Sequence, residues 1–183
     1  KLPHVEVQIA DDGEILIRGL NVFIGYFKDE KATKGTLDEK NWLHTGDVGH
    51  IDKEGFLFIT DRKKDIIITG GGENIAPQMI EGKINQIQLI GHSVVIGDKK
   101  KFLTALITIN HETVESFLAP LGVDKKENFE DYSKDPKIRS YLEEEITKMN
   151  KGLARVQTIK KFIILPKFFD VSTGELSPTM KLK

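Results

Sequence analysis

The sequence predicts an α+β protein in which a β-rich N-terminal segment precedes a small α+β domain. Up to about residue 60, apolar and polar residues alternate as they do in half-buried strands. Beyond that point, short apolar runs alternate with segments of helical period, in the order β-β-α-β-β-α-α-β. The charged stretch "DRKKD" separates the two patterns, so the domain boundary is expected there.

The first segment predicts two hairpins. "HVEVQIA" and "EILIRG" flank an Asp-Gly turn, and "VGHID" and "FLFITD" flank the turn "KEG". The polar connection between the hairpins favours a short helix near residues 29–33. "KKDIIIT" predicts one further strand after the charged break.

The second segment predicts three helices and three strands. Pro77 suits a first helical turn, and Met79, Ile80, Ile84 and Ile87 follow it at helical spacing. "HSVVIGD" and "FLTALITI" read as strands joined by the turn "KKK", and "TIKKFIIL" reads as a last strand. A short helix over 112–118 is expected to end at Pro120, and a solvated charged loop to follow. The clearest helix covers residues 136–153, with a core-facing stripe of Ile138, Tyr141, Leu142, Ile146, Met149 and Leu153.

Composition excludes several classes of function. The net charge of −1 gives no electrostatic reason to expect binding to nucleic acid or to an anionic membrane surface. The chain has no cysteine, which excludes disulfides and thiolate chemistry. No apolar run approaches the roughly 20 residues of a membrane span. The start "KLPHVEVQIA" has neither an initiator Met nor a signal peptide, so we expect a piece of a longer protein.

Several motifs occur in a fixed order along the chain. They are "DDGEILIRGLNVFIGY", then "WLHTGDVGHIDKEGFLFITDRKKDIIITGGGENIAPQMIE", then "LSPTMK". Taken singly, "DRKKD" reads as a solvated turn and "GGG" as a flexible turn. The glycines are not a P-loop, because no Gly-Lys-Ser/Thr follows them. Together they resemble the adenylate-forming superfamily of acyl-CoA synthetases, luciferases and peptide-synthetase adenylation domains. The long 62–81 hairpin and the "PTMK" ending are similar to long-chain (bubblegum-like) fatty acyl-CoA synthetases.

The resemblance implies a domain plan. Residues 1–61 would end the large N-terminal nucleotide-binding domain, residues 62–65 would form a hinge, and residues 66–183 would be the mobile C-terminal domain. That domain is expected to contain a mixed three-stranded sheet, a hairpin and packed helices. Lys64 matches the hinge position, where a solvated charge can exchange polar contacts as the domain rotates. An ordinary exposed lysine is the alternative.

The resemblance also assigns site residues. Asp47 would accept hydrogen bonds from the ribose hydroxyls of ATP or AMP, and Arg62 would contact the same region. Gly70, Gly71 and Gly72 would line the channel for the pantetheine arm of CoA, with Gly71 the central candidate and a plain flexible turn the alternative. Lys181 would be the catalytic lysine of adenylation, ahead of Lys183.

Some residues receive no role. The five histidines have no metal-ligand spacing, so no metal site is expected. The turn at Lys99–Lys101 reads as solvated, with a place near the CoA phosphates as the alternative.

The implied function is that of an AMP-forming long-chain fatty acid-CoA ligase, an acid-thiol ligase of fatty acid and lipid metabolism. ATP, fatty acid and CoA would give acyl-CoA, AMP and pyrophosphate through an acyl-adenylate. The phosphate loop and the motif whose Glu helps to bind Mg²⁺ are absent, so the fragment alone is expected to be inactive, with its own N-terminal domain as partner. A cytoplasmic or membrane-peripheral location is compatible. The alternatives are an adenylation domain of another carboxylate-activating ligase and a non-catalytic partner-binding module.

Overall fold

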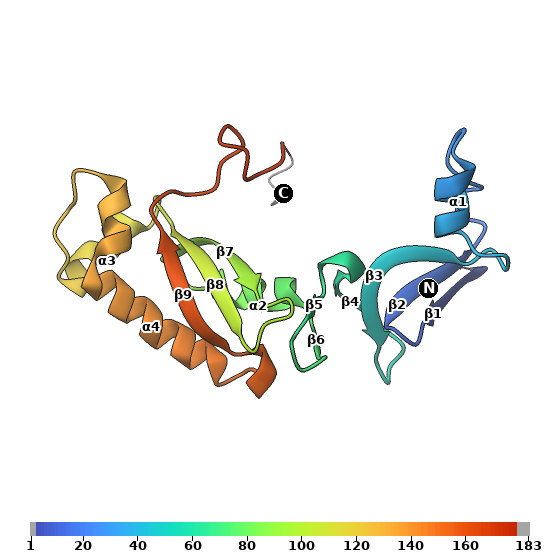
Figure 1. Cartoon of the computed structure of the whole chain (residues 1–183), viewed down its shortest axis with the longest axis horizontal. Helices are drawn as coiled ribbons and strands as arrows, with labels where there is room; N and C mark the ends of the chain where they lie inside the picture. The colour runs from blue at the N-terminus through green and yellow to red at the C-terminus, as the bar shows by residue number, and fades with distance from the viewer. Residues whose placement is uncertain (1–2, 179–183) are drawn as a thin grey trace. The chain divides into compact units, whose positions relative to one another are not determined.

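The computed structural model describes residues 3–178 and divides the chain into two compact units, residues 1–66 (unit 1) and 67–183 (unit 2) (Figure 1). Unit 1 contains a four-stranded sheet. Unit 2 contains a two-stranded sheet, a three-stranded sheet and three α-helices. The predicted α+β class is therefore confirmed.

The sheet of unit 1 follows chain order. Its strands are β1 (Val5–Ile9), β2 (Glu14–Gly19), β3 (Leu43–Ile51) and β4 (Leu57–Arg62), and each pairs antiparallel with the next. Both predicted hairpins are present. The connection between β2 and β3 holds α1 (Glu30–Thr36), which begins where the Asp29 carboxylate accepts the Ala32 N–H at 2.8 Å.

Unit 1 buries little apolar surface of its own. Ile15 and Leu16 of β2 are buried. Many large apolar side chains of the same unit are exposed, namely Leu20, Phe23, Ile24, Tyr26, Phe27, Ile51, Phe56, Leu57, Phe58 and Ile59. So many exposed large apolar side chains are typical of surfaces that pack against another part of a protein.

The strand predicted over "KKDIIIT" is mostly wrong. Residues Lys63–Asp65 form a 3₁₀ turn, η1, and only Ile67–Ile68 form a strand, β5. β5 pairs antiparallel with β6 (Asn74–Ile75). After Ile68 the chain turns back through Gly70–Gly72, where the Gly70 N–H donates to the Lys100 carbonyl at 2.8 Å.

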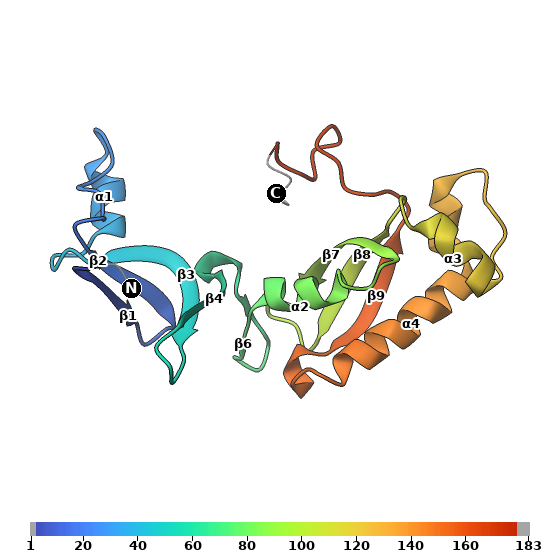
Figure 2. The ribbon, with the colours of Figure 1, turned by 180° about the vertical axis from the view of Figure 1, so that it is seen from behind.

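The three-stranded sheet of unit 2 is mixed, as expected. β7 (Ile90–Ile96) and β8 (Leu103–Ile109) pair antiparallel, while β8 and β9 (Ile159–Leu165) pair parallel. Parallel strands need a long crossover connection, and the helices between β8 and β9 supply it. Figures 1 and 2 show this sheet from its two sides.

Two helices of unit 2 begin with proline and bury the predicted apolar positions. α2 (Pro77–Ile84) buries Ile80 and Ile84, whereas Met79 is 37% exposed, contrary to the prediction. α4 (Pro136–Asn150) buries Ile138, Leu142 and Ile146, and Tyr141, Met149 and Leu153 pack against the same core. Because the stripe faces this core, its prediction as a packing surface is confirmed.

Three predicted boundaries in the crossover differ from the structure, the first being the end of α4 at Asn150 in place of the predicted 153. α3 (Val114–Leu121) continues through Pro120 and ends at Gly122, whose φ is +63°. A proline in the last turn removes only one hydrogen bond, so the helix tolerates it. The predicted solvated loop contains a 3₁₀ helix, η2 (Phe129–Lys134), because Tyr132 is buried and its hydroxyl accepts the Lys126 N–H at 3.1 Å.

Candidate functional site

Asp47 and Arg62 lie opposite each other on the adjacent strands β3 and β4 of unit 1. They are paired residues in the β3–β4 ladder, and Arg62 Nε lies 3.1 Å from Asp47 Oδ1. The Asp47 side chain is 29% exposed and that of Arg62 is 53% exposed, so both remain accessible to a ligand. One oxygen of the carboxylate is thereby oriented by the guanidinium, and the pair has further acceptor capacity for a vicinal diol.

Glycines shape the strand that carries Asp47. Gly46 has φ of +70°, a conformation that L side chains rarely adopt. At Gly49, a Cβ atom would fall 2.2 Å from the Phe58 carbonyl oxygen, so only glycine lets β4 approach this closely. The β3–β4 register shifts between Val48 and Gly49. This bulge leaves Asp47 opposite Arg62.

A buried carboxylate holds the same part of β3. The Glu14 side chain is 5% exposed; its Oε1 accepts the Gly46 N–H at 2.9 Å, and its Oε2 lies 3.0 Å from His44 Nδ1. Lys63 Nζ lies 2.8 Å from Glu14 Oε2 and 2.7 Å from Asp12 Oδ2. Burial alone would raise the pKa of Glu14, but hydrogen bonds from Lys63, His44 and Gly46 outweigh it and lower that pKa.

The same contacts shift the partners of Glu14. Hydrogen bonding to Lys63 lowers the pKa of Asp12, and hydrogen bonds to Asp12 and Glu14 raise the pKa of Lys63. All three groups therefore keep their charges near neutral pH. Their ionic network connects the start of β2, the part of β3 before Asp47 and the turn that contains Lys64.

Lys64 lies beside the Arg62 pair. It is exposed in the 3₁₀ turn Lys63–Asp65 and, with Gly46, Arg62 and Lys63, lines a shallow cavity of about 300 Å³. Lys64 precedes the end of unit 1, which is at residue 66. The structure therefore brings together three of the predicted positions, Asp47, Arg62 and Lys64, within unit 1.

The three predicted glycines lie in unit 2, in the loop of the β5–β6 hairpin. The Thr69 N–H donates to the Glu73 carbonyl at 3.0 Å, and the Gly72 N–H donates to the Thr69 carbonyl at 2.9 Å. Gly72 has φ of +82°, and a Cβ at Gly70 would lie 3.3 Å from the Lys100 carbonyl oxygen. Gly71 has neither constraint, since its Cβ would meet only Thr69 Oγ1 at 3.7 Å.

Two further predictions concern the catalytic lysine and metal binding. Lys181 and Lys183 lie outside the described residues. Within residues 3–178, no group of three or more His, Asp or Glu side chains is arranged to hold a metal ion.

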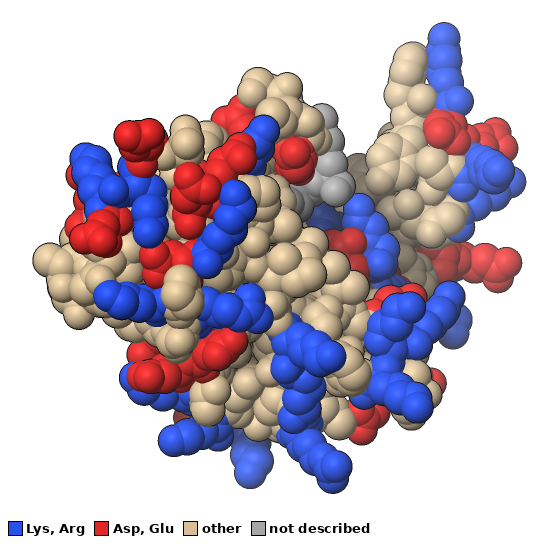
Figure 3. All heavy atoms as spheres, turned by 60° about the vertical axis from the view of Figure 1, so that its left-hand side comes forward, with Lys and Arg blue, Asp and Glu red and all other residues tan. Residues whose placement is uncertain are grey.

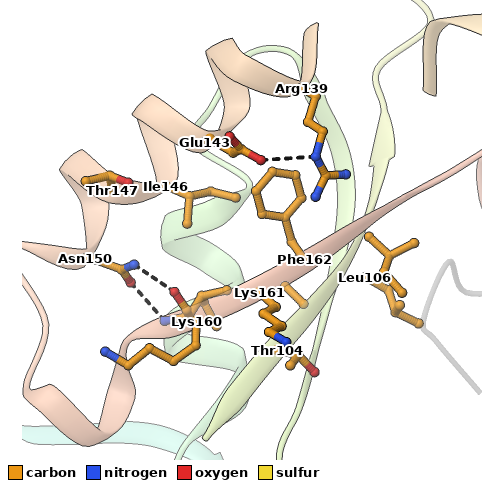
Figure 4. A pocket seen from close by; sticks show the side chains of 13 residues that line it. Thr104, Leu106, Arg139, Glu143, Ile146, Thr147, Asn150, Lys160, Lys161 and Phe162 are labelled. Atoms are coloured by element: carbon orange, nitrogen blue, oxygen red, sulfur yellow. Dashed lines mark hydrogen bonds and ion pairs between the residues drawn. The ribbon is translucent and has the colours of Figure 1, made fainter. Parts of the chain in front are cut away.

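A larger cavity of about 660 Å³ lies elsewhere in unit 2, between α4 and the strands β8 and β9 (Figure 4). Arg139 on its wall donates to Glu143 at 3.0 Å and lies over the Phe162 ring. The Asn150 side chain donates to the Ile159 carbonyl and accepts the Ile159 N–H, each at 2.9 Å. None of the predicted site residues within 3–178 lines this cavity.

Comparison with known families accounts for the second unit. The sequence model of the AMP-binding enzyme C-terminal domain matches residues 64–175, which is more than half of the chain. The chain belongs to this family. The match begins at Lys64, in the turn beside Arg62, and includes the glycine hairpin and the mixed sheet.

Curated relatives of this chain include long-chain fatty acid-CoA ligases. The chain is 41% identical to FadD15 of Mycobacterium tuberculosis over 100% of its own length and 30% of the relative. It is 41% identical to ACSBG2 of Xenopus laevis and 37% identical to ACSBG1 of Homo sapiens, with 93% of this chain aligned in each. The chain therefore spans about a quarter to a third of the curated relatives it matches.

Solved structures of adenylate-forming enzymes share the fold. O-succinylbenzoate coenzyme A synthetase from Bacillus subtilis, determined with ATP and magnesium ion, matches 99% of this chain with a TM-score of 0.66 and 27% identity. The adenylation domain of a carboxylate reductase from Mycobacterium chelonae matches 97% of the chain with a TM-score of 0.76, at 22% identity. The chain covers 33% and 28% of these proteins, respectively.

Sequence reasoning missed the Glu14 network of this family member. The sequence indicates no role for His44, which precedes "TGD", or for Asp12, Glu14 and Lys63. Glu14 begins an alternating strand, and its partner Lys63 lies 49 residues along the chain. The density of acidic residues in "DDGE" was the one available signal, and it indicates a solvated turn equally well.

Proposed function

We infer that the chain is the C-terminal part of an AMP-forming long-chain fatty acid-CoA ligase. The full-length protein would join a fatty acid carboxylate to the α-phosphate of ATP, release pyrophosphate, and pass the acyl group from AMP to the CoA thiol. Support comes from relatives of that activity that align with nearly all of this chain. The single structural observation that supports a nucleotide site is the ion pair between Asp47 and Arg62.

The pair suits a nucleoside. Arg62 occupies one Asp47 oxygen, and a carboxylate has about four lone-pair positions, so the two ribose hydroxyls can still donate to it. Arg62 keeps further donors on its planar fork for the sugar or the α-phosphate. ATP with Mg²⁺ is therefore the proposed nucleotide, and the magnesium ligands would come from the rest of the full-length protein.

Lys64 is proposed as the hinge. Its place in a short 3₁₀ turn just before the boundary of two compact units supports this assignment. Residues that end an element can absorb a large change in backbone angles. The exposed Lys64 side chain can exchange its polar partners with water during the rotation.

The hairpin of Gly70, Gly71 and Gly72 is proposed to line the CoA channel. Gly71 is the best candidate for direct passage of the pantetheine arm, because the fold itself requires no glycine there. Lys181 is proposed to hold the acyl carboxylate and the α-phosphate together during adenylation. The exposed apolar surface of unit 1 is proposed to pack against the preceding part of the large domain.

Pyrophosphate release and acyl-CoA formation by the full-length protein test the proposal. We expect pyrophosphate release to depend on a long-chain fatty acid, and Lys181→Ala to suppress it. Asp47→Asn should raise the KM for ATP while leaving the KM for CoA unchanged. Absence of fatty acid-dependent pyrophosphate release would contradict the ligase. Release with other carboxylic acids alone would favour a different carboxylate-activating ligase, and no activity with partner capture would favour a non-catalytic module.

A further inference from the structure

One end of the three-stranded sheet of unit 2 is strongly basic. We call this surface the basic face, and it consists of Lys99, Lys100, Lys101, Lys151, Arg155, Lys160 and Lys161 with the apolar Phe102 and Val156. Segments 99–102 and 151–161 contain these seven basic residues and no Asp or Glu, in a chain whose net charge is −1. All seven basic residues are exposed.

The fold brings these two segments together. Leu103 and Ile159 are paired residues where the parallel strands β8 and β9 begin, so the turn before β8 lies beside the segment that leads into β9. Lys161 Nζ lies 6.0 Å from the centre of the Phe102 ring. The β7–β8 turn and the turn after α4 lie side by side in Figures 1 and 2. Figure 3 shows how Lys and Arg side chains project from the surface of the molecule.

The positive charge of the basic face is not neutralised locally. Within residues 3–178, none of its seven basic side chains forms an ion pair with an acidic residue. Other lysines of unit 2 do so, for example Lys125 with Glu115 at 2.6 Å and Lys148 with Glu145 at 2.7 Å. Clustered cations of this kind create a potential that attracts an extended anion.

Apolar side chains are interspersed with the lysines. Phe102 is 42% exposed directly after Lys101, and Val156 is exposed directly after Arg155. Lys160 and Lys161 also border the cavity between α4 and β9, and Figure 4 shows their side chains on its wall. Exposed apolar residues next to basic ones match the interface of a bilayer, where lysines reach phosphates and apolar groups enter the acyl boundary.

We propose that the basic face docks unit 2 on an anionic membrane surface. The charge complementarity is with lipid phosphates, and Phe102 and Val156 supply the shallow apolar contact. A soluble nucleotide would be held by a few convergent groups, whereas seven cations spread over two segments suit a continuous anionic plane. The docking does not depend on ligase activity, because a vesicle containing no substrate provides the same surface.

Flotation of the 183-residue chain with vesicles tests the proposal. We expect binding to vesicles of phosphatidylcholine and phosphatidylglycerol in roughly equal amounts, weaker binding to phosphatidylcholine alone, and loss of binding as salt rises. Each lysine at an anionic surface contributes a factor of about five, so combined Lys99→Gln, Lys100→Gln and Lys101→Gln should lower the partition coefficient about 100-fold. Phe102→Ser should also weaken binding.

Matched variants in unit 1 provide the control. Lys31→Gln, Lys40→Gln and Lys53→Gln remove three exposed lysines of unit 1 and should leave binding unchanged. Phe56→Ser removes an exposed phenylalanine of unit 1 and should also have no effect. Circular dichroism should show that all variants are folded, since exposed Lys→Gln changes rarely perturb a fold.

Three outcomes would overturn the proposal. Equal losses in the control and test variants would mean that binding does not use the basic face. Salt-independent binding to phosphatidylcholine would indicate that the chain binds vesicles through the exposed apolar residues of unit 1. Displacement from vesicles by CoA, or binding to polyglutamate that Phe102→Ser does not weaken, would assign the face to a soluble anion or an acidic protein.

Discussion

The carboxylate of Glu14 and the ammonium of Lys63 form an ion pair at 2.8 Å, and the Glu14 side chain is 5% exposed. Glu14 stands at the start of β2 and Lys63 at the start of η1, between β4 and the end of unit 1. The ion pair therefore holds the 3₁₀ turn that contains Lys64 against the four-stranded sheet of unit 1. Because Glu14 also accepts the Gly46 N–H, it links the proposed hinge to the part of β3 that precedes Asp47.

Glu14→Gln should destabilise unit 1. The substitution leaves Lys63 and the Gly46 N–H with a neutral partner, and hydrogen bonds to charged groups are worth more than neutral ones, so we expect a loss of about 2 kcal/mol. Trp42, the single tryptophan of the chain, lies in unit 1, and its fluorescence during urea unfolding measures the change. Glu6→Gln breaks the exposed pair with Arg18 and should cost under about 1 kcal/mol. Equal losses in the two variants would contradict this role for Glu14.

The stability of unit 1 should fall in acid through the same carboxylate. The folded-state pKa of Glu14 is lowered from its ordinary value of 4.5, so the folded state holds the proton less readily than the unfolded chain. The contribution of Glu14 is therefore present above about pH 4.5 and is lost as pH falls through the lowered pKa. Unfolding monitored by Trp42 between pH 7 and pH 3, roughly, should show a smaller decline in Glu14→Gln than in the wild type.

Asp135 should have two separable effects on unit 2. Its Oδ1 caps α4 by accepting the Lys137 N–H at 2.9 Å, and its Oδ2 lies 2.9 Å from Lys126 Nζ. Asp135→Asn keeps the cap and removes the charge, so we expect a loss of about 1 kcal/mol, whereas Asp135→Ala removes both and should cost about 2–3 kcal/mol. Far-ultraviolet circular dichroism during urea unfolding measures both. If Asn proves as costly as Ala, the cap contributes nothing.

Local patterns predicted the packing of unit 2 well. Helical spacing alone placed Ile80, Ile84, Ile138 and Leu142 on buried faces, because burial of a helix face follows from the 3.6-residue period. Met79 was the exception, since one position on the edge of the stripe can face either way. The predicted end of α3 was wrong, because a proline in the last turn of a helix destabilises it less than one in the helix interior.

Long-range pairing could not be predicted from local patterns. The resemblance named Asp47 and Arg62 separately, but their ion pair depends on the β3–β4 register and on the bulge at Gly49. The Glu14–Lys63 pair joins residues 49 positions apart in the sequence. Neither contact has a periodic signal. The roles of Asp47, Arg62, Lys64, the glycines and Lys181 stay predictions until ligand binding and catalysis are measured.

Gly71 and Gly72 should respond differently to alanine. At Gly72, with φ of +82°, a Cβ introduces backbone strain, and Gly72→Ala should destabilise the hairpin by about 1–2 kcal/mol. Gly71→Ala meets only Thr69 Oγ1 at ordinary contact distance and should leave stability within about 0.5 kcal/mol. If the hairpin lines the CoA channel, Gly71→Ala should slow acyl-CoA formation while pyrophosphate release continues. Unchanged thioester formation in Gly71→Ala would remove Gly71 from the channel.

Arg62→Ala should impair the nucleotide step without unfolding unit 1. The Arg62–Asp47 pair is about half exposed at the arginine, and pairs of this kind contribute about 0–1 kcal/mol, so Trp42-monitored stability should change little. The Asp47 carboxylate would lose the partner that orients it, and the KM for ATP in pyrophosphate release should rise about 10-fold or more, as expected for one charge-assisted hydrogen bond. Arg18→Ala is the matched control, because Arg18 pairs with Glu6, lies over Trp42 and does not line the cavity beside Arg62. A large stability loss in Arg62→Ala, or an unchanged KM for ATP, would show that this arginine serves the sheet and not the nucleotide.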